Sequence, residues 1–177
     1  ELAPQCDLVI AVDYGHGLIN SEATGVLCRD APFLAVNTQS NAGNRGFNTI
    51  SKYPKADYIC LSLDEIRLEE RNRQGDLREM MLSVSGKLDC SKIMVTRSKE
   101  GNTCYDRDEG FCDTPALASN VVDRVGAGDA DRRAAVAAQR RLGLCCLQRG
   151  SELFHAVGCV ACHAPTEPAL AGGEVPE

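Results

Sequence analysis

The sequence predicts an α/β fold built on a mostly parallel sheet flanked by helices. Four short apolar segments, each bounded by turn residues, alternate with segments of helical composition. Strands that alternate with helices require crossover connections, and these give parallel strands with helices on both faces of the sheet. The strand segments are apolar throughout, as expected of strands that are buried on both faces.

The predicted elements follow one another along residues 7–114. The expected strands cover 7–13, 33–37, 57–61 and 92–96, and the expected helices cover 21–28, 64–71 and 76–88. Segments 102–106 and 110–114 flank the turn residues 107–109 and predict a hairpin. The Gly- and Asn-rich stretch from Asn41 to Asn48 is either a substrate loop or a plain surface loop.

Polar residues stand where the predicted parallel strands end. These residues are Asp13, Asn37, Ser62 and Thr96. In open α/β sheets ligands bind beyond the carboxyl ends of the strands, so these residues point towards any site. For Asp13 two interpretations stay open, a contact to a sugar or a simple cap of the strand.

Composition excludes several classes of protein. The 177 residues carry 19 Lys and Arg against 25 Asp and Glu, a net charge of −6. An acidic chain argues against a nucleic-acid partner, and no apolar run approaches the roughly 20 residues that span a bilayer. Six of the ten cysteines are scattered singly among apolar segments. This usage is typical of a reducing compartment, so we expect a cytoplasmic protein.

The strongest local motif is the turn Gly126-Ala127-Gly128-Asp129. Two glycines separated by a small residue let the backbone turn into a helix whose free N–H groups face an anion. An Asp at that point can take a proton from an attacking hydroxyl. A tight turn before a helix, without any ligand, is the alternative interpretation.

Four motifs in order make the chain similar to the PfkB/ribokinase-like carbohydrate kinases over about residues 6–130. Residues 123–130 resemble the family's Asp-x-x-Gly-Ala-Gly-Asp-Ala signature. Residues 13–17 resemble the Asp-Tyr-Gly-x-Gly turn of members that act on heptose phosphates. Residues 62–65 stand where the family has Asn-x-x-Glu, and residues 96–101 stand where it has Thr-x-Gly-x-x-Gly.

This resemblance implies transfer of the ATP γ-phosphoryl group to a hydroxyl of a sugar or sugar phosphate. It implies ATP and Mg²⁺ as cofactors, and we further expect a homodimer. Carried over by position, it makes Asp129 the catalytic base, Gly126, Ala127 and Gly128 the anion hole, and Glu65 an indirect organiser of Mg²⁺. Thr96, Ser98 and Gly101 would border the nucleotide, and Asp13 and Asn37 the substrate.

The chain departs from the family pattern at several positions. Ser62 replaces the motif Asn, Ser98 replaces a Gly, and Asp131 stands where an aromatic or apolar residue is usual. Segments corresponding to the sugar-binding half, the lid and the helices that close over adenine are not recognisable. We therefore expect residues 1–130 to form a partial kinase domain, followed by a helical linker over 131–147.

Residues 148–177 resemble a truncated cytochrome-c-like segment. Cys159, Cys162 and His163 have the Cys-x-x-Cys-His spacing of covalent haem attachment, which implies electron transfer outside the cytoplasm, in the periplasm. Only 14 residues follow His163 and none is Met, so the usual distal ligand is lacking. A zinc site with Cys145 or Cys146, and a tail of thiols without ligand in a non-catalytic chimera, remain the alternatives.

Overall fold

The structure is a computed structural model that describes residues 2–115 of the 177. Its sheet contains six strands in the spatial order β1-β2-β3-β4-β5-β6. They are β1 (Val9–Asp13), β2 (Leu34–Thr38), β3 (Tyr58–Ser62), β4 (Lys92–Thr96), β5 (Asn102–Asp106) and β6 (Gly110–Thr114). The helices are α1 (Ser21–Asp30), α2 (Leu63–Glu69) and α3 (Leu77–Leu88), with short 3₁₀ turns at Ala3–Gln5, Ile50–Lys52 and Ser98–Glu100.

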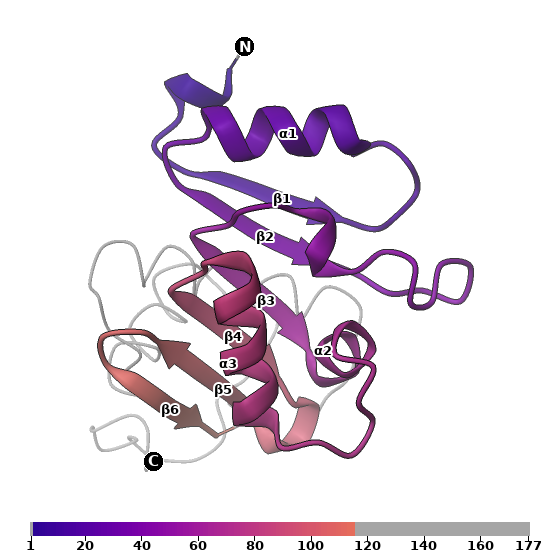
Figure 1. Cartoon of the computed structure of the whole chain (residues 1–177), viewed down its shortest axis with the longest axis vertical. Coiled ribbons are helices and arrows are strands. Elements are labelled where there is room, and N and C mark those ends of the chain that lie inside the picture. The colour runs from indigo at the N-terminus through magenta and orange to yellow at the C-terminus, as the bar shows by residue number, and fades with distance from the viewer. Residues whose placement is uncertain (1, 116–177) are drawn as a thin grey trace, which may run out of the picture. The chain divides into compact units, whose positions relative to one another are not determined.

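Strands β1 to β4 are all parallel, which confirms the predicted sheet. β1 pairs with β2 from Val9 opposite Leu34 to Asp13 opposite Thr38, and β3 pairs with β4 up to Ser62 opposite Thr96. Figure 1 shows β1, β2 and β3 pointing the same way, and the register of β4 against β3 is parallel as well. The carboxyl ends of these strands therefore share one edge of the sheet, which we call the carboxyl edge.

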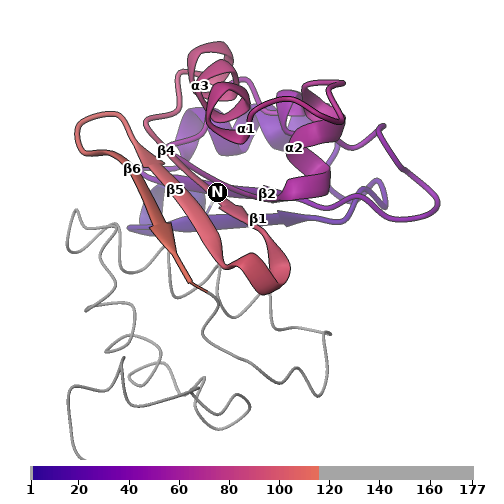
Figure 2. The same cartoon turned by 90° about the horizontal axis from the view of Figure 1, so that it is seen from below.

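The described helices α1, α2 and α3 lie on the same face of the sheet (Figure 2). The core lies between them and β1–β4, and its fully buried members include Val36, Ile59, Leu61, Ile66, Met81, Val84, Ile93 and Val95. Each such side chain contributes about 1.5–3 kcal/mol through burial. The expectation of helices on both faces is thus confirmed for one face. Helices on the other face stay a prediction, which concerns residues outside 2–115.

The central strands are buried on both faces. Alternate residues of β2, β3 and β4 that do not belong to the helix-facing core are also buried, namely Ala35, Tyr58, Cys60 and Met94. This explains why the strand segments are apolar throughout rather than alternating in polarity. The six cysteines within the described residues are free thiols.

Each helix begins at a polar side chain that caps it. Asn20 accepts a hydrogen bond from the Ala23 amide of α1, and Asp76 accepts one from the Glu79 amide of α3, at 2.9 Å and 3.0 Å. These side chains satisfy amides that have no partner within the helix. Within residues 2–115, no helix combines the length and the apolar character needed to cross a bilayer.

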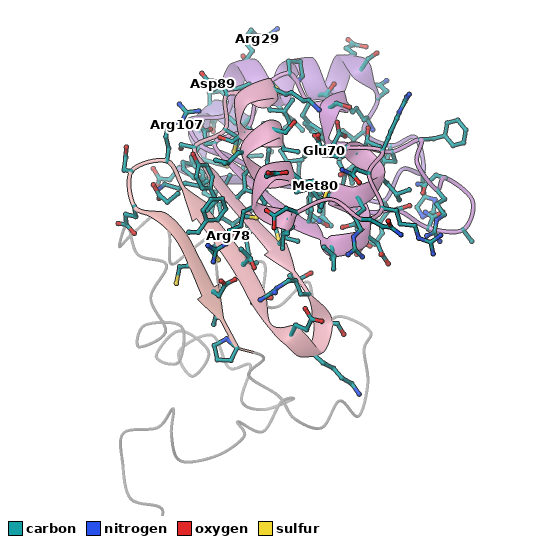
Figure 3. The ribbon with its side chains drawn as sticks, turned by 60° about the horizontal axis from the view of Figure 1, so that its bottom comes forward. Arg29, Glu70, Arg78, Met80, Asp89 and Arg107 are labelled. Carbon is teal, nitrogen blue, oxygen red and sulfur yellow. The ribbon has the colours of Figure 1, made fainter. Side chains whose placement is uncertain are left out.

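The hairpin β5–β6 is anchored at the amino end of β4. Lys92 of β4 forms a partly buried ion pair with Asp106 of β5, and the Arg107 amide donates to the Ser91 carbonyl at 2.9 Å. Arg107 also pairs with Asp89, which ends α3, at 3.0 Å (Figure 3). These contacts lie at the opposite end of β4 from the carboxyl edge.

By internal contacts the chain divides into two compact units. The first contains Glu1–Thr96 and Thr103–Phe111, and the second contains Arg97–Asn102 and the chain from Cys112 onward. The strand-ending residues of β1 to β4 all belong to the first unit.

Candidate functional site

Asp13 lies at the centre of a buried network at the end of β1. Its Oδ2 accepts hydrogen bonds from Lys52 Nζ at 2.6 Å and from the Tyr53 hydroxyl at 3.1 Å. Its Oδ1 accepts one from the Gly15 amide at 2.9 Å. The Asp13 side chain is only 3% exposed, so its charge is balanced within the network rather than by water.

The network sets the protonation of both acidic groups. Burial alone would raise the pKa of Asp13, but the hydrogen bonds from Lys52 and Gly15, the Lys52 charge and the Tyr53 hydroxyl outweigh it and hold this pKa below its ordinary value. Burial and the neighbouring carboxylate raise the pKa of Tyr53. Asp13 is thus ionised and Tyr53 is a neutral hydrogen-bond donor at neutral pH.

Asparagine amides dock the loop after β2 onto the turn after β1. Asn48 Nδ2 donates to the Asp13 carbonyl at 2.9 Å, and the Nδ2 groups of Asn41 and Asn44 donate to the Tyr14 carbonyl at 3.0 Å and 2.9 Å. Gly15 makes this approach feasible, because its φ is +70° and a Cβ there would overlap Asn44 Nδ2. The stretch from Asn41 to Asn48 is therefore an anchored part of the carboxyl edge.

Asn37 of β2 is also buried at this edge. Its Nδ2 donates to the Cys60 carbonyl in the middle of β3 at 2.7 Å, so the amide bridges two parallel strands. A substrate contact by Asn37 stays a prediction.

Ser62 and Glu65 form a reciprocal cap at the start of α2. The Ser62 hydroxyl accepts from the Glu65 amide at 3.3 Å, and Glu65 Oε2 accepts from the Ser62 amide at 2.7 Å. Glu65 Oε1 accepts from the Ser40 amide at 3.1 Å, which ties the loop after β2 to α2. Ser-x-x-Glu before an apolar stretch is a signature of such a capping box. The helix accordingly begins at Leu63 rather than at the expected Asp64.

The predicted nucleotide residues lie at the last position of β4 and in the turn that follows it. The Thr96 hydroxyl lies 3.5 Å from the Leu61 carbonyl of β3. In the second unit, the Arg97 amide donates to the Gly101 carbonyl at 2.7 Å and closes a turn in which Ser98 has φ +55° and Gly101 has φ +85°. Ser98 thus keeps the left-handed backbone that the Gly of the family motif would adopt freely.

Several predicted residues lie outside the described residues. These are the anion-hole residues Gly126, Ala127 and Gly128, the base Asp129, and the haem-motif residues Cys159, Cys162 and His163. The same holds for the predicted linker over 131–147 and the segment 148–177. Among residues 2–115, no group of three or more His, Cys, Asp or Glu side chains is arranged to hold a metal ion.

Sequence reasoning missed Lys52 and Tyr53. Both belong to a stretch that carries no strand, helix or motif signal, and they lie 39 and 40 residues from Asp13 in sequence. The parallel pairing of β1 with β2 and the docked loop after β2 bring the two segments together. The capping box at Ser62, by contrast, carries a local signal that could have been recognised.

The chain is similar to one curated protein and to many solved kinases. It is 24% identical over 143 residues to the bifunctional protein HldE of Citrifermentans bemidjiense, which covers 79% of this chain and 28% of that protein. No protein-family model matches the chain. The chain thus spans little more than a quarter of the length of this relative.

Solved structures show the fold. The ligand-free nucleoside kinase of Burkholderia thailandensis matches with a TM-score of 0.64 at 20% identity, over 92% of this chain and 52% of that one. Arabidopsis thaliana ribokinase in complex with ribose and ATP matches with a TM-score of 0.62 at 16% identity, over 90% and 50%. The chain therefore has a ribokinase-like α/β fold and spans about half of these proteins, which confirms the predicted resemblance at the level of the fold.

Proposed function

We propose that this chain is part of a ribokinase-like kinase that transfers the γ-phosphoryl group of ATP to a hydroxyl of a sugar or sugar phosphate. The observation that supports this most is the carboxyl edge. Three family motifs that are far apart in sequence end or follow β1, β3 and β4, at Asp13, Glu65 and Thr96. Parallel sheets bind ligands at this edge, and the Gly126–Asp129 motif supplies the phosphate chemistry.

In this proposal Asp129 removes the proton from the acceptor hydroxyl as its oxygen attacks the γ-phosphorus, and the bond from that phosphorus to the β–γ bridging oxygen breaks to release ADP. The N–H groups of Gly126, Ala127 and Gly128 stabilise the charge on the transferred phosphoryl oxygens. Asp13 and Asn37 lie on the substrate side of the sheet, at the ends of β1 and β2. The protein would act in the cytoplasm as a homodimer.

Glu65 fits an indirect role towards Mg²⁺. Both of its carboxylate oxygens accept backbone amides, which orients them and leaves each with a further lone pair. Mg²⁺ retains several water ligands in such sites, and oriented carboxylate oxygens can accept hydrogen bonds from those waters. When bound, the ion would neutralise charge on the phosphates.

Thr96, Ser98 and Gly101 would border the nucleotide in the turn after β4. The left-handed backbone at Ser98 and Gly101 supports this, since the motif has Gly at both positions. Ser98 adds a Cβ and a hydroxyl where a Gly would let the nucleotide approach the backbone.

The proposal is tested by Asp129→Asn in the full chain, with Asp131→Asn as the matched control. We expect Asp129→Asn to abolish ATP-dependent phosphorylation across a panel of sugars and sugar phosphates and to leave nucleotide binding largely intact. Mg·ATP at 100 times its dissociation constant should stabilise the wild-type chain by about 2.7 kcal/mol. In thermal melts this corresponds to a shift of roughly 5–10 °C. Unchanged turnover in Asp129→Asn would overturn the assignment of the base.

A further inference from the structure

The ammonium of Lys52 is the charged group that the Asp13 network presents outward. Lys52 ends the 3₁₀ turn Ile50–Lys52 that follows the docked loop. Its Nζ donates to Asp13 Oδ2 at 2.6 Å and lies 3.5 Å from Asn48 Oδ1, at the limit of a hydrogen bond. An ammonium has three N–H donors and no acceptor, so a third donor is left for a group outside the network.

Exposure within the pair is uneven. The Lys52 side chain is 26% exposed and the Asp13 side chain only 3%. Both oxygens of Asp13 already accept hydrogen bonds from Gly15, Lys52 and Tyr53. A ligand arriving at the carboxyl edge near β1 therefore meets the positive member of the pair.

We infer that Lys52, oriented by Asp13, binds an oxyanion of the ligand at the carboxyl edge of β1 and β2. An ammonium held by a buried carboxylate loses little side-chain freedom on binding, and its hydrogen bond to a phosphate oxygen is charge-assisted. Asp13 is in this view a positioning residue, whereas Lys52 touches the ligand. The inference rests on the proposed function for the identity of the edge as a substrate site.

The test variant is Asp13→Asn combined with Lys52→Met. Lys52→Met alone would leave a buried carboxylate without its partner and could unfold the chain. The double variant removes both charges and leaves the net charge unchanged, so a change in anion affinity reports the lost ammonium contact. Lys55→Met is the matched control, because Lys55 is exposed and only three residues away. Lys52→Arg keeps the positive charge and tests for rescue.

The probes are inorganic phosphate, glucose 6-phosphate and uncharged glucose, titrated calorimetrically into the full chain at constant ionic strength. We expect one or both phosphate probes to bind the wild-type chain and Lys55→Met alike. We expect the double variant to bind about tenfold more weakly or not at all, and Lys52→Arg to stay within a few-fold of wild type. Tighter binding of glucose 6-phosphate indicates a sugar phosphate as the ligand, and equal binding indicates free phosphate.

Unchanged affinity in the double variant would overturn the inference, because the phosphate would then be bound elsewhere, for example at Gly126–Gly128. It would equally be overturned by a wild-type chain that binds neither phosphate probe, or by an equal loss in Lys55→Met. Stabilisation by Mg·ATP does not depend on Lys52 and should persist in the double variant. If Mg·ATP failed to stabilise the wild-type chain while the phosphate probes still bound, that result would count against the kinase proposal alone.

Discussion

Two partly buried ion pairs of similar build lie at opposite ends of the parallel strands. At the carboxyl edge Asp13 pairs with Lys52, with side chains 3% and 26% exposed. At the amino end of β4 Asp106 pairs with Lys92, with side chains 5% and 22% exposed. Each aspartate also accepts the amide two residues further along, from Gly15 and from Asp108, both at 2.9 Å.

The surroundings of the two pairs differ. Asp13 receives a further hydrogen bond from the buried Tyr53, and its own carbonyl accepts from Asn48 of the docked loop. Asp106 belongs to the hairpin β5–β6. Its partner Lys92 lies only 14 residues away in sequence, so this pair is local. An ion pair therefore does not by itself mark a binding site. The position of the pair on the sheet is the better indicator of a site, because ligands of parallel sheets bind at the carboxyl edge.

The largest expected effect comes from removing either lysine. Lys52→Met and Lys92→Met each leave a buried carboxylate without its partner, and we expect each to lower the free energy of unfolding by about 3 kcal/mol. Urea unfolding followed by circular dichroism measures this, and Lys55→Met should stay within about 0.5 kcal/mol of wild type. A loss confined to one of the two lysines would break the comparison.

The next largest loss of stability is expected on substitution of the glycines near the two ion pairs. Gly15 and Gly110 have φ of +70° and +83°, but only at Gly15 would a Cβ meet neighbours, Asn44 Nδ2 and Asn48 Cβ. We expect Gly15→Ala to cost about 2–3 kcal/mol and to undock the loop, because overlap adds to backbone strain. Gly110→Ala and Gly17→Ala, with open space around them, should cost only about 1 kcal/mol. Equal losses at the three positions would show that the loop contact adds nothing.

The sequence predicted the elements more fully than it predicted the network. The hairpin strands and β4 have the predicted bounds, because the apolar run of β4 and the turn residues 107–109 between the hairpin strands carry local signals. The ends of β2 and β3 extend one residue further than predicted, to Thr38 and Ser62. Polar residues at these ends carry no apolar signal, although their backbone still pairs with the neighbouring strands.

Side-chain partners across long sequence separations are a different matter. The spacing of Asp13, Gly15 and Gly17 predicted a turn at a strand end, but no local pattern connects it with Lys52 or Tyr53. That connection depends on the register of β1 against β2 and on the path of the loop that follows β2. Contacts of this kind depend on tertiary packing. A capping box such as Ser62 with Glu65, by contrast, is encoded within four consecutive residues.

Acid should weaken both pairs in the same direction. Burial opposes ionisation of Asp13 and Asp106, but hydrogen bonds from Lys52 and Lys92 outweigh it and hold each pKa below its ordinary value. A lowered pKa contributes stability that is complete above the unfolded pKa of about 3.9 and is lost as the pH falls through the folded pKa.

The charge-free double variants Asp13→Asn/Lys52→Met and Asp106→Asn/Lys92→Met should each lose part of this acid sensitivity. The expected change is about 1.4 kcal/mol per unit of pKa lowering. Urea unfolding between about pH 2 and pH 7 measures the slope of stability against pH for each variant. A slope that stays as steep as in wild type would show that the corresponding aspartate is not held ionised by its pair.

The smallest expected change in stability concerns two residues with strained backbone that flank β4. Ser98 follows its carboxyl end and Asp89 precedes its amino end, with φ of +55° and +45°. Ser98→Gly relieves left-handed backbone strain of about 1–2 kcal/mol in the folded chain. Glycine also makes the unfolded chain more flexible, which costs about 0.5–1 kcal/mol, so we expect the free energy of unfolding to rise by about 0.5–1 kcal/mol. Asp tolerates this conformation better, and Asp89→Gly also removes the contact with Arg107, so its stability should not rise. Thermal melts of both variants, with and without Mg·ATP, make the comparison. A gain at Ser98 together with a larger shift on adding nucleotide would mean that the serine both strains the turn and restricts access to its backbone, whereas a loss at Ser98 would mean that contacts of its side chain outweigh the strain.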